Sequence, residues 1–276
     1  MIGERPGKRR PLDTVVGVVI VGFLLFPLYW MLNIALQPSQ DLLKIPPEYF
    51  PVDATLSAFS NAISAEGHHL IVSLVVALGT AALSLIVATP AAFAMAQLRV
   101  RLTRPVLFAL LIGQMVPSIV MANALFKIMN DVHLINSLFA LILADSTLAI
   151  PFAVLILRAF MVGIPRELLE AAYVDGASPF RTLLSVTIPV SRNALITAGL
   201  FSFLFAWGDF LFALTLTTTD SRTPVTVGIY HFIGAYTTDW NSVMATGVMA
   251  SIPAAILLVV AQRYVSAGVT GGAVKG

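Results

Sequence analysis

The stretch EAAYVDGASPFRTLLSVTIP, residues 170–189, is polar and rich in turn-forming residues, and it lies between two long apolar runs. Pro165 precedes it and suits the first turn of a helix, because the N–H that proline lacks would be unpaired there anyway. Gly176 can end that helix in the left-handed conformation. Ser178 and Pro179 then supply an N-cap and a first residue for another helix. The stretch therefore predicts a helix, a tight turn and a second helix.

The second half of this hairpin carries apolar residues at helical spacing. Between them the chain is polar, so the apolar side chains should form one ridge along the helix. We expect that ridge to face a partner. Its members are Phe180, Leu183, Leu184 and Ile188.

The rest of the composition is that of an integral membrane protein. Of 276 residues, 58% are hydrophobic and only 11% are charged, too few to cover a soluble globule of this size. Several runs approach or exceed the roughly 20 apolar residues that a helix needs to cross the hydrocarbon. The first run is too long for a signal peptide and no small-residue cleavage site follows it. We expect an all-α fold with transmembrane spans at residues 14–36, 70–96, 106–126, 134–160, 194–217 and 243–263.

The basic residues predict the orientation, because Lys and Arg collect in short cytoplasmic loops. Of the 16 basic residues, 13 fall on one side of the predicted spans and 3 on the other. Both termini, the hairpin and the tail at residues 264–276 are therefore expected in the cytoplasm. The formal charge of +2 follows from this topology and requires no nucleic-acid partner. The larger group is Arg5, Lys8, Arg9, Arg10, Arg99, Arg101, Arg104, Arg158, Arg166, Arg181, Arg192, Arg263 and Lys275; the smaller is Lys44, Lys127 and Arg222.

Prolines and a short amphipathic segment predict local departures from six straight spans. A proline inside a membrane helix frees a backbone carbonyl and can kink the helix. The third, fourth and sixth spans contain Pro117, Pro151 and Pro253. The first outer loop, residues 37–69, predicts an extended crossing and then a short interfacial helix. The apolar residues of that helix are Leu56, Phe59 and Ile63.

Two carboxylates fall inside predicted spans. Asp145 is near the middle of the fourth span, and Asp209 is in the fifth beside Trp207 and Phe210. Ionisable groups at this depth are costly and usually face the bundle interior or a water-filled path. They are candidates to bond a hydroxylated solute or to relay protons. The structural alternatives are a backbone bond near Pro151 for Asp145 and an interhelical bond for Asp209.

Motifs for catalysis or cofactor binding are missing. The chain has no cysteine, and its nearest approach to a phosphate loop, residues 3–8, has the wrong spacing. His68 and His69 lie at the end of the first outer loop, but no third ligand follows at suitable spacing, so interfacial histidines are favoured over a metal site. We expect no enzyme, no metal and no cofactor in this chain. If transport uses ATP, another chain hydrolyses it.

The hairpin resembles the EAA loop of ABC importer permeases. The match runs Glu170, Ala171, Ala172, three residues, Gly176, nine residues, then Val186, Thr187, Ile188 and Pro189. The usual pattern has Ile at 186 and Leu at 188. The similarity extends over most of the chain to the carbohydrate-uptake branch, and there to the inner-subunit group of maltose permeases. It includes FPLYWMLNIALQP at 26–38, the tail at 262–276 and FAWGDFLFAL at 205–214, where Gly208 replaces the usual Asn.

The resemblance implies the rest of a transporter. The fold would be that of a type I ABC importer permease in a bacterial plasma (inner) membrane. A second homologous permease would pair with this chain. Two ATP-binding subunits would carry the ATP and Mg, and an extracytoplasmic solute-binding protein would deliver a sugar, oligosaccharide or polyol. Residues 165–189 would be the coupling loop, contacting the ATPase through Glu170, Ala171, Ala172, Asp175, Gly176, Ala177 and Pro189, and the tail would reach it through Gln262, Arg263 and Lys275.

A competing hypothesis is a stand-alone proton-coupled sugar or polyol carrier that uses Asp145 and Asp209. It is disfavoured because the chain shows no convincing internal repeat of the kind found in such carriers, and because it leaves the hairpin unexplained. A non-transporting membrane scaffold is a third possibility, which would accumulate no solute.

Overall fold

The computed structural model describes the backbone of residues 11–98, 100–234 and 238–273, and the side chains of these residues except 11–13, 43 and 265–273. Within these residues the secondary structure is helical, and the one β-interaction is an isolated bridge between Ile233 and Thr238. The all-α fold predicted from the sequence is thus confirmed. Six of the predicted cytoplasmic cations lie outside the described residues: Arg5, Lys8, Arg9, Arg10, Arg99 and Lys275.

The chain divides into two compact units. Unit 1 takes its described residues from Met1–Ala65 and Tyr230–Ser251, and unit 2 from Glu66–Ile229 and Ile252–Gly276. Two long helices, α2 (Ser57–Gln97) and α12 (Trp240–Ala273), begin in unit 1 and continue into unit 2.

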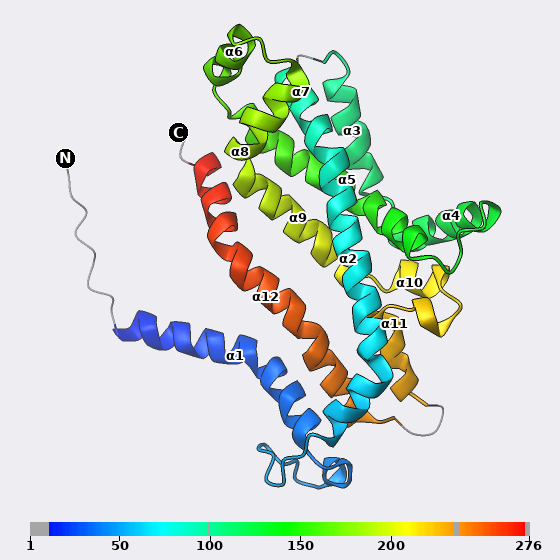
Figure 1. Ribbon diagram of the computed structural model, residues 1–276. Helices are drawn as coiled ribbons and strands as arrows, with labels where there is room; N and C mark the ends of the chain where they lie inside the picture. The colour runs from blue at the N-terminus through cyan, green and yellow to red at the C-terminus, as the bar shows by residue number, and fades with distance from the viewer. Residues whose placement is uncertain (1–10, 99, 235–237, 274–276) are drawn as a thin grey trace. The chain divides into compact units, whose positions relative to one another are not determined.

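Unit 1 contains α1 (Pro11–Leu36), the short helix η1 (Ser39–Leu43) and the starts of α2 and α12, coloured blue and orange at those points in Figure 1. Alanines form its core, which lets the helices approach closely. They are Ala35, Ala58, Ala62 and Ala245. The side chain of Asn241 donates to the carbonyls of Ile34 and Gln37, both at 2.8 Å, so the start of α12 is bonded to the end of α1.

Unit 2 contains the remaining helices. After α2 come α3 (Thr103–Gly113), α4 (Ser118–Asp131), α5 (Leu138–Val162), α6 (Arg166–Val174), α7 (Pro179–Thr182), the π-helical turn η2 (Leu183–Thr187), α8 (Ile188–Val190), α9 (Arg192–Trp207), α10 (Leu211–Leu216), η3 (Asp220–Arg222) and α11 (Val225–Gly228), followed by η4 (Ile229–Phe232), which leads into unit 1. Helix α5 begins where the Ser137 hydroxyl accepts a bond from the Ala140 N–H at 3.0 Å.

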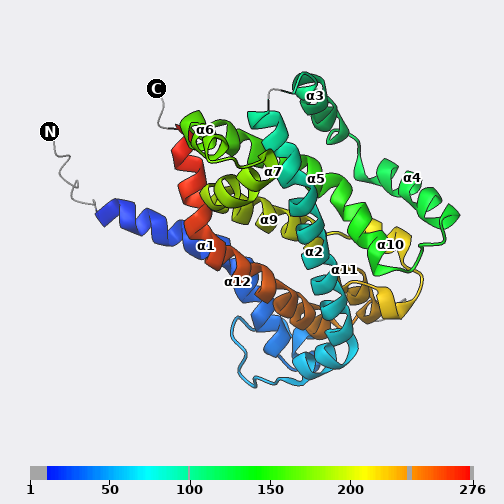
Figure 2. The same cartoon turned by 45° about the horizontal axis from the view of Figure 1, so that its top comes forward.

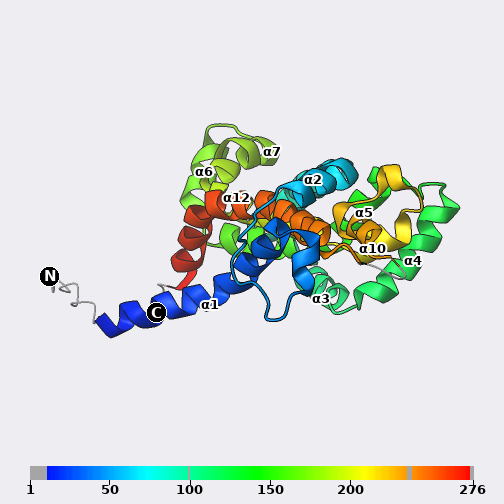
Figure 3. The same cartoon turned by 90° about the horizontal axis from the view of Figure 1, so that it is seen from below.

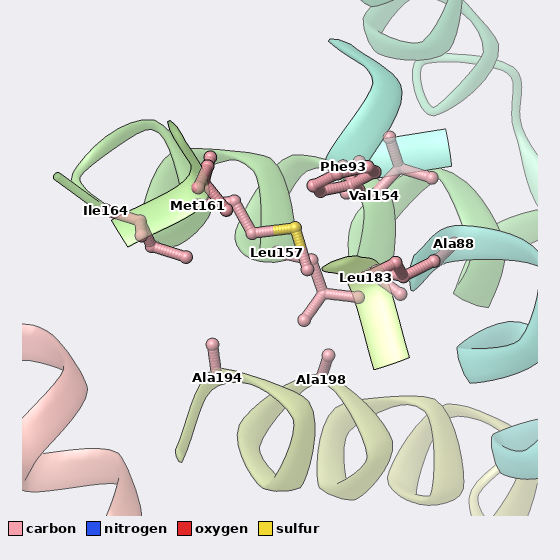
Figure 4. Close-up of a cluster of buried hydrophobic side chains, with 12 residues drawn as sticks. Ala88, Phe93, Val154, Leu157, Met161, Ile164, Leu183, Ala194 and Ala198 are labelled. Atoms are coloured by element: carbon pink, nitrogen blue, oxygen red, sulfur yellow. The ribbon is translucent and has the colours of Figure 1, made fainter. Parts of the chain in front are cut away.

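The main core of unit 2 joins α2, α5 and α9. Figure 4 shows Ala194 and Ala198 of α9 directed at Leu157 and Met161 of α5. All four side chains are at most 3% exposed. Small residues on one helix and long ones on the other allow close packing, as expected where lipid supplies no hydrophobic force between helices. The same cluster includes one residue from α6 and one from η2.

Among the residues that the structure describes, four helices are long and apolar enough to cross a membrane, and two bent helix pairs raise the number to six if each pair is one span. The third predicted span, 106–126, is one of these pairs: α3 and α4 meet at 99°, and the break is visible in Figure 2. Pro117 has ψ 134° and precedes α4, so it separates two helices instead of kinking one. Pro151 and Pro253 both lie inside continuous helices.

Helix ends differ from the prediction at three other places. The predicted interfacial helix and the second span form one 41-residue helix, α2, because the glycine between them, Gly67, is tolerated inside it. The fifth span, 194–217, is interrupted after Trp207, where α9 ends. Helix α12 continues through most of the predicted tail, to Ala273.

Candidate functional site

The first helix of the hairpin, α6, begins directly after Pro165, as predicted. Leu169 is its one buried residue, at 4% exposed, and lies in the core of unit 2. Glu170 and Ala171 are exposed and Ala172 is half-buried. Helix α6 is therefore attached to the core of unit 2 through one apolar side chain, and its acidic and small residues are exposed or half-buried.

The turn after α6 is a glycine C-cap. The Ala177 N–H donates to the Ala172 carbonyl at 2.9 Å and the Gly176 N–H to the Tyr173 carbonyl at 3.0 Å, the paired bonds of a Schellman motif. Gly176 has φ +79°, which L side chains rarely adopt, although a Cβ placed there would meet nothing within 4 Å. Backbone conformation alone therefore favours glycine at this position.

The second half of the hairpin begins as predicted, and its four ridge residues, Phe180, Leu183, Leu184 and Ile188, line one apolar hollow of about 410 Å³ together with residues of α2 and α9. The Ser178 hydroxyl accepts from the Arg181 N–H at 3.3 Å, with Pro179 next in the chain. Leu183 is 4% exposed and buried in the core, whereas Phe180 is 68% exposed and Leu184 50%. Part of the predicted ridge therefore packs inside the same chain, while Phe180 and Leu184 keep exposed apolar surface.

A polar hollow lies against α6. It has a volume of about 250 Å³ and is lined by Gln97, Arg166, Leu169, Glu170 and Tyr173. The side chain of Gln97 donates to the Met161 carbonyl at 2.5 Å, which bonds the end of α2 to the end of α5. Figure 3 shows α6 and α7 side by side. Glu170 therefore stands at the rim of a hollow, beside an arginine and an amide.

The carboxylate of Asp209 caps a helix. Its two oxygens accept from the N–H groups of Phe212, at 3.3 Å, and Ala213, at 2.9 Å, in the first turn of α10. The Thr226 hydroxyl donates to the Asp209 carbonyl at 2.6 Å. Asp145 on α5 is 4% exposed and close enough to Asp209 for their charges to interact. The structure thus brings together the two carboxylates that the sequence singled out.

Aromatic packing accounts for much of the ring-rich run on α9. Phe201 and Phe205 meet Phe152 of α5 edge to face, with centroids 5.3 and 5.2 Å apart. Trp207 stacks on Phe203 at 5.5 Å and is 8% exposed. The contacts with Phe152 therefore join α5 and α9, and the Phe203–Trp207 stack lies within α9.

The two histidines attach α2 to the segment at η3. His68 Nε2 lies 2.9 Å from the Ser221 carbonyl. His69 is buried, with Nδ1 2.8 Å from the Glu66 carboxylate and Nε2 3.1 Å from the Asp220 carbonyl. A Cβ at Gly228 would overlap this Glu66–His69 pair. The sequence reasoning missed Glu66, although its spacing of three residues from His69 on a helix was a usable signal.

Some contacts between distant parts of the chain have no obvious signal in the sequence. Asn136 has φ +61°, and its side-chain oxygen accepts from the N–H groups of Thr218 and Thr219, at 2.5 and 3.1 Å. No local pattern predicts that bond or the place of Gln97 beside α6. The tail candidates Gln262 and Arg263 are exposed on α12, and Lys275 lies outside the described residues.

Comparison with known proteins identifies the family. Residues 88–271 match the family described as the binding-protein-dependent transport system inner membrane component. The chain belongs to this family. It is 32% identical over 269 residues to the diacetylchitobiose uptake system permease protein of Streptomyces coelicolor, covering 97% of this chain and 98% of that one. It is also 32% identical over 273 residues to the trehalose transport system permease protein of Mycobacterium tuberculosis, covering 98% and 99%.

Solved structures support the fold. A bacterial ABC transporter involved in the import of the acidic polysaccharide alginate matches with a TM-score of 0.78 at 20% identity, over 96% of this chain and 99% of that chain. An inward-facing methionine ABC transporter matches with a TM-score of 0.62 at 16% identity, over 75% and 98%. The chain is a multi-pass inner-membrane permease with the fold of an ABC importer subunit, and a stand-alone carrier is not favoured.

Replacing Gly176 should loosen the hairpin through its backbone alone. We expect Gly176→Val to lower the stability of the folded turn by about 1–2 kcal/mol, because a β-branched residue is strained at this φ. Gly176→Asn should cost less, because Asn tolerates the left-handed region. If local opening governs hydrogen exchange at the Ala177 amide, the exchange rate should rise about tenfold for each 1.4 kcal/mol lost from the free energy of that opening. Equal protection in all three proteins would contradict the strained-turn account.

Proposed function

We propose that this permease carries a sugar, oligosaccharide or polyol into the cytoplasm and is powered by ATP hydrolysis on separate subunits. Support for the substrate class comes from the relatives, whose names give diacetylchitobiose, trehalose and, in Agrobacterium fabrum, sulfoquinovosyl glycerol. These three solutes are glycosides or oligosaccharides. The observation that carries the coupling proposal is the exposed hairpin at residues 165–189, which packs into the hydrophobic core of unit 2 through two buried leucines, Leu169 and Leu183.

The hairpin is the coupling element in this proposal. Its exposed side contains Glu170, Ala171, Asp175 and Gly176, together with the apolar side chain of Val174, which is 87% exposed. Ala172 and Ala177 are partly exposed, and their small side chains add little bulk at the turn. Pro189 lies in the last turn before α9. A cation of the ATP-binding subunit would pair with Glu170 beside the hollow, and the apolar tip would enter a cleft.

The assembly follows from the same proposal. A second homologous permease would complete the translocation path, two ATP-binding subunits would hold the ATP and Mg, and a solute-binding protein would deliver the substrate. Both termini and the hairpin would face the cytoplasm, as the 13-to-3 division of basic residues predicts. Gln262 and Arg263, with Lys275 further on, would contact the ATPase side.

The solute path is proposed to run past the carboxylates at the α9–α10 break. Asp145 and Asp209 would accept bonds from substrate hydroxyls or from the water that surrounds them. Trp207 and Phe210 flank the break in the chain and would offer ring faces to a sugar. The cap that Asp209 makes on α10 would fix the position of its carboxylate.

Reversing the charge at the rim of the hollow should uncouple the transporter. We expect Glu170→Lys to insert and fold normally but to release its ATPase, because a cation would then face a cation. Glu167→Lys is the matched control: it makes the same charge change one turn earlier on α6, at an exposed residue that does not line the hollow. The measurement is co-purification of the ATP-binding subunit and solute-stimulated ATP hydrolysis. Normal values for Glu170→Lys would rule out this coupling role.

Removing the charge of Asp209 should separate its two roles. Asp209→Asn keeps an oxygen for the α10 cap, so we expect intact assembly but reduced ATP-dependent uptake in proteoliposomes. Asp209→Ala removes the cap as well and should also lose about 0.5–2 kcal/mol of stability. Uptake by Asp209→Asn with unchanged kinetics would assign the residue to capping alone. Uptake at constant ATP should be insensitive to a protonophore in every variant.

A further inference from the structure

The loop that follows α1 is folded back along that helix. The side-chain amides of Asn33 and Gln37 both donate to the Glu48 carbonyl, at 3.0 and 2.9 Å. The Tyr29 hydroxyl donates to the Tyr49 carbonyl. Residues 44–52, here called the aromatic loop, are thus bonded to the last turns of α1.

Contacts between aromatic rings show which part of α1 the aromatic loop packs against. Tyr29 meets Phe50 at a centroid distance of 6.2 Å, and Trp30 meets Tyr49 at 6.0 Å. Tyr29 precedes the end of α1 at Leu36 by seven residues, or about 10 Å of helix at 1.5 Å per residue. Both contact residues of α1 lie within the candidate span Thr14–Leu36. The aromatic loop therefore returns to the depth of the outer end of that span.

Four side chains of the loop are largely apolar and well exposed. Ile45 is 97% exposed, Val52 78%, Phe50 72% and Tyr49 62%. The loop also has few backbone donors to satisfy, because Pro46, Pro47 and Pro51 have no N–H. A missing donor removes a desolvation cost wherever water is scarce.

The charges of the loop are paired with one another. The ammonium of Lys44 lies 2.9 Å from Asp41 and 2.8 Å from Glu48. Hydrogen bonds to Asp41 and Glu48 raise the pKa of Lys44 above its usual value, so its charge persists. Lys44, Asp41 and Glu48 together keep one net negative charge, and the apolar side chains of the loop stay exposed within the part of the chain that the structure describes.

We propose that the aromatic loop inserts Ile45, Tyr49, Phe50 and Val52 into the headgroup–acyl boundary of the bilayer, in the leaflet at the C-terminal end of α1. The surface it presents is continuous with the exposed apolar surface of α1, a candidate membrane span, since its rings pack directly on Tyr29 and Trp30. Tyrosine and other amphipathic rings favour this depth, and aliphatic neighbours add buried area. The loop would hold the end of α1 at a fixed depth.

Spin labelling tests the proposal, because the chain has no cysteine of its own. Single cysteines would replace Ile45 and Val52, both too exposed for the substitution to disturb packing. Gln40, exposed beyond the end of α1, is the aqueous control, and Leu25, 53% exposed within α1, is the hydrocarbon control. The labelled permease, in its full complex, is placed in phospholipid vesicles. Collision rates with oxygen and with a water-soluble nickel chelate are then measured.

We expect labels at 45 and 52 to collide with the nickel chelate several-fold less often than the label at 40, and with oxygen more often, approaching the label at 25. Chelate collision equal to that at 40 would overturn the proposal. Protection from both reagents would also overturn it, because it would mean that a protein subunit and not lipid covers the loop.

Discussion

Burial of Leu169 and Leu183 connects the hairpin to the membrane helices. Each is 4% exposed, and both belong to the cluster that contains Leu157 and Met161 of α5 and Ala198 of α9. Val186 and Ile188 of the same hairpin pack against this cluster as well. Because packed interiors are close to incompressible, a displacement of the hairpin in the proposed coupling role would be passed to α5 and α9 instead of being absorbed locally. The exposed half of the hairpin is then free to serve a partner.

The same packing places the polar site at the other end of α9. Helix α9 extends from the hairpin side at Arg192 to Trp207, and the break that follows it carries Asp209. Aromatic contacts with α5 hold this end of the helix. Helix α9 thus begins next to the hairpin, after an 84° bend, and ends at the proposed solute path, so it would connect the two sites in the proposed coupling.

Local features of the site could be predicted from the sequence, while tertiary ones could not. Gly176, Ser178 and Pro179 act through bonds within a few residues, so their roles were correctly predicted from residue type and spacing. Pro117 and Pro151 look alike in sequence, yet one separates two helices and the other lies inside α5, because neighbouring packing decides whether a helix resumes in line.

Residues that act across the fold have no such signal. The apolar ridge was predicted on a 3.6-residue period and its four residues do line one hollow, but their spacing did not show that Leu183 packs into the core of the same chain. Gln97 reaches the hollow beside Glu170 from a helix far earlier in the chain. The cap by Asp209 was hidden because the sequence around it is apolar enough to read as an unbroken span.

The central claim is that the tip of the hairpin contacts the ATP-binding subunit. It is tested most directly by a single cysteine at Val174, which is 87% exposed in a chain without other cysteines. In the assembled transporter, a short bifunctional reagent should cross-link this cysteine to the ATP-binding subunit, and a hydrophilic maleimide should label it more slowly than in the isolated permease. Equal labelling in both, with no cross-linked product, would contradict the account.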